Sequence, residues 1–171
     1  MKKLLILLCM AAVLCGCSKA EPTTEATTER ELPITGYHFE GAVFSIDSDW
    51  ETETRDGKFY MHPDETSFLS IEYSSLVKTD FDESELDVMA SSIGLKEIDT
   101  TTKRISENTY GYKYAEVGGL EDIDEGTFWV YEDVILTPNG TYTVTMFNDT
   151  KYNDAEHLYS TEDIVSTFRL E

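Results

Sequence analysis

The sequence predicts an α+β fold with a central antiparallel β-sheet flanked by helices. Two tight hairpin turns, Asp56-Gly57 and Pro138-Asn139-Gly140, and one amphipathic helix with clear start and stop signals support this class. Asp-Gly and Asn-Gly pairs favour hairpins because both residues tolerate the positive φ angles of such turns. We expect one domain over residues 34–171, which is long enough to bury a single core.

The first half of the domain reads as extended segments. A β run at 43–46 precedes the hairpin of residues 50–55 and 58–62. In the next segment, residues 67–73, apolar and polar side chains alternate, so that Leu69, Ile71 and Tyr73 share one face and belong to the core. Trp50, at the start of the hairpin, is expected to be buried and to support the fold.

A helix is expected between Phe81 and Gly94. Asp82 and Glu85 have the spacing of a capping box, and Phe81 can pack on Leu86 as a hydrophobic staple. Gly94 supplies a left-handed end. The apolar stripe between these signals consists of Leu86, Met89, Ala90 and Ile93.

A second β region and a short closing helix complete the domain. The apolar face of the last long strand carries Tyr142, Val144 and Met146. Ser160 and Asp163 have the spacing of a second capping box. The strands are expected over residues 97–106, 109–117, 126–137 and 141–147. The closing helix should pack on the sheet through Tyr159, Ile164, Val165 and Phe168.

The N-terminal residues carry a targeting signal. Lys2 and Lys3 precede an apolar run that is shorter than the ~20 residues needed to span a bilayer, as in a signal peptide. The run ends in Leu14-Cys15-Gly16-Cys17, which resembles the lipobox of bacterial lipoproteins. This resemblance implies removal of residues 1–16 and attachment of lipid to Cys17. An ordinary secretory signal with incidental cysteines is the alternative.

Residues 17–33 are expected to form the lipidated cysteine and a disordered tether. The segment is rich in Thr and Glu, contains Pro22 and Pro33, and has a single Leu. It cannot bury enough apolar surface to offset the entropy lost on ordering. We therefore expect a domain held by lipid on the extracytoplasmic face of a cell membrane.

Composition excludes several classes of partner. The full chain has a net charge of −21, and after loss of residues 1–16 it keeps 11 basic and 34 acidic residues, or 11 − 34 = −23. Such a charge argues against nucleic acid and against peripheral binding to anionic lipid. All three cysteines, Cys9, Cys15 and Cys17, precede the domain, which excludes disulfides and thiolate metal sites from it. No cofactor is expected.

Three segments of the domain resemble the PsbP/Mog1-like family. They are residues 41–50 (GAVFSIDSDW), 139–145 (NGTYTVT) and 164–170 (IVSTFRL), although Ser48-Asp49 replaces the usual proline before the tryptophan. The resemblance implies a central antiparallel sheet between helical layers, an α/β/α sandwich. It implies no shared reaction, because members of the family are mostly binding or assembly factors.

The acidic loop 118–126 is the best candidate for a cation site. Asp122, Asp124 and Glu125 could offer oxygen ligands to a hard cation such as calcium. The spacing is not that of an EF-hand, and a solvated loop is the alternative. The turn at 47–49 (Asp-Ser-Asp) has the same two interpretations.

Other reactive or aromatic residues give weaker signals. His38, His62 and His157 are far apart in the sequence and fit no catalytic motif, so incidental histidines are the favoured interpretation. An aromatic group on two neighbouring strands could form a stacking groove for a sugar or peptide, or could simply pack across strands. Its members are Tyr110, Tyr112, Tyr114, Phe128, Trp129 and Tyr131.

These features lead to three hypotheses of function. The first is a lipid-tethered, non-enzymatic module that binds or assembles protein partners. The second is a lipoprotein that binds a cation or small ligand through the acidic loop 118–126. The third is a hydrolase.

Replacing Cys17 by serine tests the anchor. We expect Cys17→Ser to release the domain from membranes, or to leave an unprocessed precursor, without unfolding it, because the tether separates the anchor from the core. Detergent phase partitioning of the wild-type and variant proteins measures this. Unchanged partitioning into the detergent phase would remove the lipoprotein hypothesis.

Overall fold

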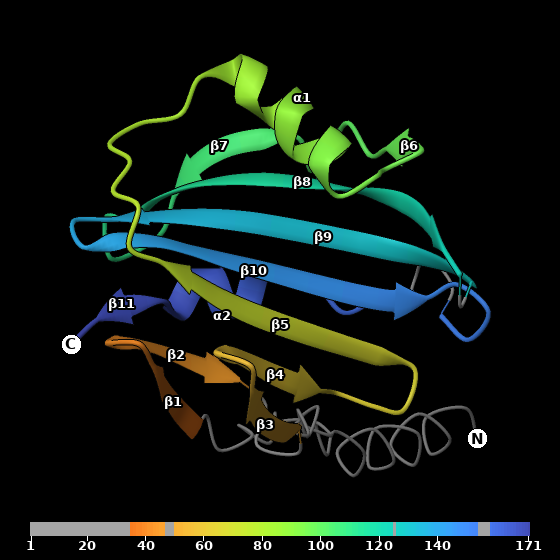
Figure 1. The fold of residues 1–171 in the computed structure, drawn as a ribbon, viewed down its shortest axis with the longest axis horizontal. Coiled ribbons are helices and arrows are strands. Elements are labelled where there is room, and N and C mark those ends of the chain that lie inside the picture. Colours follow the sequence, from red (N-terminus) through yellow and green to blue (C-terminus); the bar gives the residue numbers. More distant parts are fainter. Residues whose placement is uncertain (1–34, 47–49, 125, 154–157) are drawn as a thin grey trace, which may run out of the picture. The chain divides into compact units, whose positions relative to one another are not determined.

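The computed structural model of the protein describes residues 35–46, 50–124, 126–153 and 158–171. Within these ranges the chain forms two antiparallel sheets and two helices (Figure 1). The strands are β1 (Thr35–Phe39), β2 (Ala42–Ile46), β3 (Glu51–Arg55), β4 (Lys58–His62), β5 (Ser67–Ser74), β6 (Glu97–Ile98), β7 (Arg104–Glu107), β8 (Lys113–Ile123), β9 (Gly126–Thr137), β10 (Gly140–Asp149) and β11 (Arg169–Leu170). The helices are α1 (Glu83–Ser92) and α2 (Glu162–Thr167).

The larger sheet has eight strands. Their order is β3-β4-β5-β10-β9-β8-β6, with β7 also paired to β8. Both predicted hairpin turns are confirmed: β3 pairs with β4 across Asp56-Gly57, where φ is 53° and 77°, and β9 pairs with β10 across the turn before Gly140. The smaller sheet has the order β1-β2-β11.

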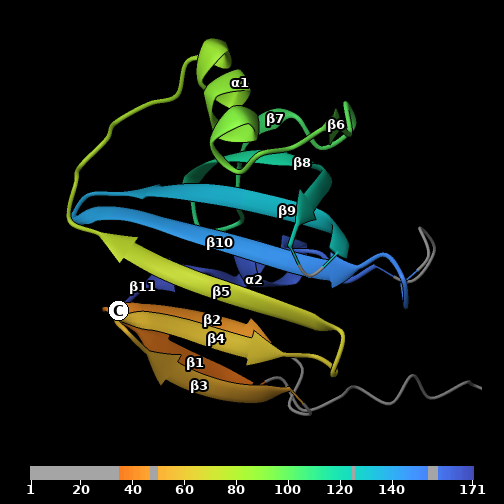
Figure 2. The same ribbon diagram turned by 45° about the vertical axis from the view of Figure 1, so that its right-hand side comes forward.

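The main core lies between the two sheets. The smaller sheet packs on the β3–β5 half of the larger one, as Figure 2 shows, and the ring of Phe59 on β4 contacts Tyr37, Phe39 and Phe44. The α2 helix covers the same face of the larger sheet farther along. The buried residues of this core are Phe39, Ala42, Phe44, Ile46, Phe59, Met61, Leu69, Ile71, Ile135, Tyr142, Val144, Met146, Ile164, Val165 and Phe168.

The α1 helix lies on the opposite face, over β7 and β8 (Figure 1). The predicted capping box is confirmed, since the Asp82 carboxylate accepts from the Ser84 N–H at 2.8 Å and the Glu85 carboxylate accepts from the Asp82 N–H at 2.8 Å. Gly94 has a φ of 78°, as its role as a stop signal requires. Leu86 and its apolar neighbours pack on the β8 side chains and form a second, smaller core.

The α2 helix is shorter than expected and begins differently. Its N-cap is Thr161, whose side chain makes no capping bond, and Ser160 accepts only a long bond of 3.4 Å from the Glu162 N–H. The predicted capping box of Ser160 and Asp163 is therefore wrong. The chain leaves the helix at Phe168, which has extended backbone angles, and continues into β11.

The predicted fold class, a sheet flanked by helices in the manner of an α/β/α sandwich, is wrong. The fold is β-rich: α2 has six residues, and a second sheet occupies most of the layer that the prediction gave to helices. The sequence pattern did not predict β1 and β11, which pair with the two sides of β2 to form the smaller sheet. None of the described helices has the length and apolar character needed to cross a membrane.

Truncating Phe168 tests whether α2 and β11 belong to the core. Phe168→Ala should lower the free energy of unfolding by ~3–5 kcal/mol, because the ring is buried between the two sheets. Val88, on the outer side of α1 and 66% exposed, is the control, and Val88→Ala should change stability by less than ~0.5 kcal/mol. Chemical denaturation gives both values. Equal effects would mean that the closing segment is peripheral.

Candidate functional site

The acidic segment 118–126 is not a loop. It is the end of the β8–β9 hairpin, with β8 reaching Ile123 and β9 starting at Gly126. The Asp122 carboxylate forms an ion pair with Lys96 and accepts a hydrogen bond from the Thr127 hydroxyl at 2.8 Å. Asp124 is exposed in the turn, and Glu125 lies outside the described residues. The positive charge of Lys96 beside the Asp122 carboxylate therefore disfavours a cation at this position.

Two glycines explain why this segment looked like a loop. A Cβ atom on Gly118 would lie 2.6 Å from the ring of Tyr131, and one on Gly119 would lie 1.9 Å from the backbone oxygen of Glu97 in β6. Both glycines therefore allow close packing within the sheet rather than flexibility.

The other candidate ligands are dispersed. No group of three or more histidine, cysteine or acidic side chains that could hold a metal ion occurs in the described ranges. His38 Nδ1 lies 2.5 Å from Glu171, and His62 Nε2 lies 4.0 Å from Glu53, at separate exposed positions. Cys17, residues 47–49 and His157 lie outside the described residues.

The predicted aromatic group is divided between the two faces of the sheet. Tyr112 and Tyr114 pack on the main core, whereas Phe128 lies on the α1 side and contacts Phe147. Tyr110 is exposed in the β7–β8 turn. Cross-strand packing therefore describes these rings better than a single stacking groove does. Trp50 is only partly buried, and its ring meets the ring of Tyr159 edge-on at 5.8 Å.

Two neighbouring carboxyl groups in the middle of β9 are the most unusual feature of the sheet. Glu132 and Asp133 are 8% and 1% exposed, and as consecutive strand residues they point to opposite faces. Glu132 stands opposite Val117 and Thr145, on the α1 face. Asp133 is on the α2 face. Buried acids normally have a hydrogen-bond or charge partner.

Neither of these acids is well satisfied. The Thr145 hydroxyl lies 3.5 Å from Glu132, at the limit of a hydrogen bond. Burial, aided by the charge of Glu72, raises the pKa of Glu132 to about 7. Burial also raises the pKa of Asp133 well above its usual range. Thr161 lies beside Asp133 and favours its charged form, but its geometry falls short of a hydrogen bond, so both carboxylate oxygens lack a partner among the described residues.

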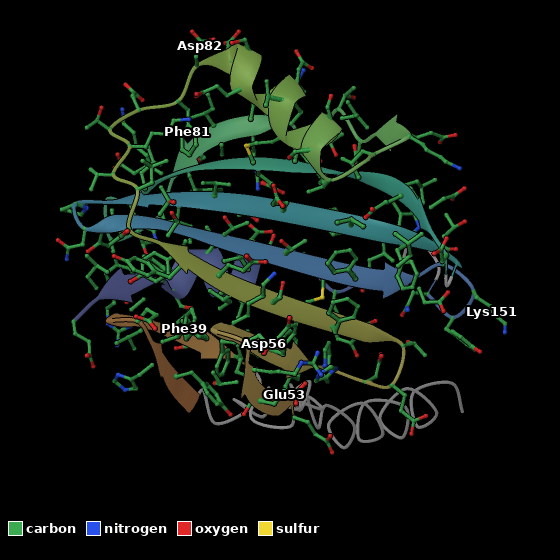
Figure 3. The ribbon with its side chains drawn as sticks, in the orientation of Figure 1. Phe39, Glu53, Asp56, Phe81, Asp82 and Lys151 are labelled. Carbon is green, nitrogen blue, oxygen red and sulfur yellow. The ribbon has the colours of Figure 1, made fainter. Side chains whose placement is uncertain are left out.

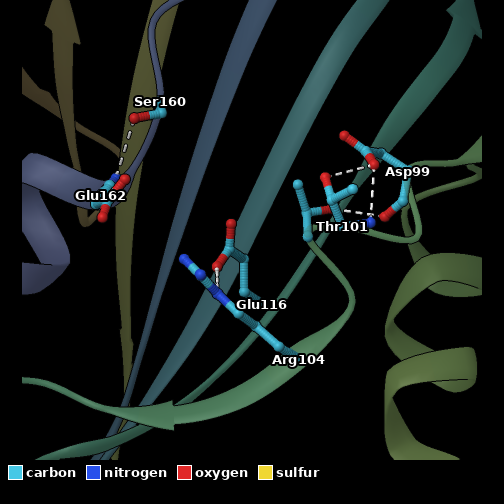
Figure 4. A network of polar contacts seen from close by, with 7 residues as sticks. Asp99, Thr101, Arg104, Glu116, Ser160 and Glu162 are labelled. Carbon is cyan, nitrogen blue, oxygen red and sulfur yellow. Dashed lines mark hydrogen bonds and ion pairs between the residues drawn. The ribbon is translucent and has the colours of Figure 1, made fainter.

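A polar network on the same face of the sheet as Asp133 includes Arg104 and Glu116 (Figure 4). Glu116 stands directly opposite Asp133 on β8, and its carboxylate accepts from Arg104 Nε at 2.5 Å. The Glu116 side chain is 11% exposed, and burial raises its pKa although Arg104 opposes the shift. Glu162, at the start of α2, and Asp99 add negative charge nearby. This negative charge adds to the effect of burial in raising the pKa of Glu116.

Sequence reasoning missed this cluster. The sequence did offer one signal, because Glu132 and Asp133 are neighbours in the middle of an otherwise apolar strand. Since side chains alternate between the two faces of a strand, one of these two acids would have to point toward the core.

A second candidate is the outer edge of the larger sheet. All five residues of β3 are exposed, and a groove of about 560 Å³ runs beside the strand. Four acidic side chains line this groove: Glu51, Glu53, Asp64 and Glu65. Figure 3 shows Glu53 on this edge, far from the cap of α1 at Asp82.

Comparisons with known proteins show the fold alone. No family model matches the sequence, and neither does any curated protein. A crystal structure of a *Bacteroides thetaiotaomicron* protein is similar, with a TM-score of 0.51 and 13% identity over 77% of this chain. This chain covers 45% of that protein, less than half of its length.

Two other solved structures are more distant. LpqN, involved in cell envelope biogenesis of *Mycobacterium tuberculosis*, has a TM-score of 0.44 and 10% identity, covering 81% of this chain and 85% of its own. A *Pseudomonas aeruginosa* protein of unknown function has a TM-score of 0.39 and 11% identity, covering 69% and 84%. The resemblance to the PsbP/Mog1-like family stays a prediction.

The buried acids predict a protein that is more stable in mild acid. Because the pKa of Glu132 rises from 4.5 to about 7 on folding, the folded state binds more protons than the unfolded state between these values. The free energy of unfolding should therefore fall as the pH rises from about 4.5 to 7. Below that window the lowered pKa of Asp82, caused by hydrogen bonds from Ser84, acts in the opposite direction.

Glu132→Gln tests this. In the variant, the free energy of unfolding should depend less on pH than in the wild type. At pH 8 it should be higher than that of the wild type by up to about 3 kcal/mol, because the variant no longer has to ionise a buried carboxyl group. Urea denaturation at pH 5 and pH 8 measures both effects, with the exposed Glu97→Gln as control. A wild-type stability that rises between these two pH values would contradict the assignment.

Proposed function

We propose that the chain is an extracytoplasmic lipoprotein, held on a cell membrane by lipid on Cys17, whose domain binds or assembles a protein partner without catalysing a reaction. The lipobox-like segment supports the anchor. Two acyl chains on one cysteine suffice for stable attachment, since each buried methylene contributes ~0.8 kcal/mol. The domain itself then needs no membrane-binding surface.

One observation carries the binding role: the larger sheet is covered over only part of its α1 face. On this face the α1 helix packs over β7 and β8, and no described helix covers β10, β5 and β4 (Figure 1). On this open part Phe68 and Phe147 stack at 4.6 Å and stay partly exposed. Lys58 and Glu72 form an ion pair on the same face. Aromatic rings bordered by polar groups are typical of protein interfaces.

Site-specific photo-crosslinking in cells tests this proposal. A photoreactive amino acid in place of Phe68 should give a discrete adduct with a partner protein. The same amino acid in place of Val88, exposed on α1, is the matched control and should give none. Equal adducts at both positions, or none at Phe68, would contradict recognition through the open face.

A further inference from the structure

Among the described residues, the outer strand β3 has a backbone partner on one side only. It is the terminal strand of the larger sheet and pairs only with β4. In an antiparallel strand every second residue directs its N–H and C=O groups away from the neighbouring strand. Proteins often protect such edges with charged side chains, proline, a bulge or a very short strand. The sequence of β3, Glu-Thr-Glu-Thr-Arg, has no proline and pairs continuously with β4. Its charged side chains repel a strand of like charge but attract one of complementary charge.

The opposite edge of the larger sheet offers less backbone. There β6 has two residues and β7 has four. In the smaller sheet, β1 directs Tyr37 and Phe39 into the main core, which fixes its position. Among the described strands, β3 is therefore the edge strand that is both extended and exposed along its whole length.

The side chains of β3 determine which strand could join it. Glu51 and Glu53 are two residues apart and therefore share one face, the same face as the open part of the sheet. The groove beside them continues the negative charge through Asp64 and Glu65. Arg55, 3.6 Å from Glu53, ends this acidic stretch. A strand added along β3 would meet carboxylates at alternate positions.

We infer that the β3 edge binds an extended segment of the partner protein that carries basic side chains at every second position. Main-chain hydrogen bonds to β3 supply the ladder, and Lys or Arg side chains opposite Glu51 and Glu53 supply the selectivity. This inference rests on the proposed function and names the partner's chemistry. A second copy of the chain fits the edge less well, because an antiparallel pair centred on Glu53 would place that residue opposite itself and each copy has a net charge of −21.

Peptide binding to the full-length mature lipoprotein tests the inference. The protein is placed in nanodiscs of zwitterionic phosphatidylcholine, so that a cationic probe does not bind the lipid. The probe is a fluorescent ten-residue peptide of alternating Lys and Thr, and binding is followed by anisotropy. We expect saturable binding of this peptide and none of its Glu-Thr counterpart.

Two sets of variants separate the backbone ladder from simple charge attraction. Two versions of the peptide carry N-methyl groups on alternate backbone nitrogens, one on every Lys and the other on every Thr. Only one of these two sets of N–H groups faces β3, so one version should lose binding and the other should keep it. In the protein, Glu51→Lys with Glu53→Lys should weaken binding about tenfold or more. Glu97→Lys with Asp124→Lys, at exposed sites away from β3, makes the same change in net charge and should weaken it less than about threefold.

Three outcomes would overturn the inference: equal binding of both N-methylated peptides, equal effects of the two charge-reversal pairs, or a concentration-dependent dimer that the β3 substitutions abolish. Thermal unfolding confirms that each variant is folded. The crosslink at Phe68 distinguishes the two proposals. If that adduct persists while the Lys-Thr peptide fails to bind, recognition at β3 is wrong and the binding role stands.

Discussion

Both sheets depend on the packing of Phe168. Its ring meets Tyr142 at 4.9 Å and Tyr112 at 5.6 Å, so it joins β10 and the start of β8 to the closing segment. The side-chain amide of Asn108 donates to the backbone oxygens of Val165 and Phe168 at 2.8 and 2.9 Å. Directly afterwards, β11 pairs with β2 in the other sheet. One short segment therefore holds α2 on the larger sheet and completes the smaller one.

Two buried acids, Asp133 and Glu116, lie close to this junction. Asp133 lies beside Thr161, the N-cap of α2. The negative charge of Glu162, the first residue of α2, raises the pKa of Glu116. An ionised carboxylate in this position lacks the water that would solvate it, so the neutral form is favoured. The pKa values of Asp133 and Glu116 are therefore both raised close to the start of α2. Arg104, the cation that contacts Glu116, is itself partly exposed and compensates only part of the negative charge.

Local chemistry was sufficient to predict the hairpins and α1. Asp56-Gly57 fixes its turn through backbone conformation alone, and Asp82 caps α1 through residues at most three positions away. In contrast, Arg169 and Leu170 form a strand only because β2 lies beside them, which no local pattern reveals. Gly118-Gly119 gave a misleading loop signal, because the ring of Tyr131 and the backbone of β6 demand glycine there.

The candidate sites differed in the same way. Glu51 and Glu53 could be placed on one face of a hairpin strand from the sequence, but the strand's position at the edge of the sheet could not. Alternation along β9 predicts that only one of the neighbours Glu132 and Asp133 is buried, whereas the structure buries both, on opposite faces. Asp122 has the carboxylate that a cation site needs, but in the structure it forms an ion pair with Lys96. The two residues are 26 positions apart in the sequence, so no local pattern could reveal this contact.

The pairing of β2 with the closing segment also has a kinetic consequence. Thr167 donates to and accepts from the backbone of Ser45 across 122 residues of sequence. Contacts between such distant residues form late, because a long loop must close before they contribute any stability. The β1–β2 and β3–β4 hairpins, in contrast, join neighbours in the sequence and can form early. The smaller sheet is completed only when the distant β11 reaches β2, so this step should limit the rate at which the whole domain folds.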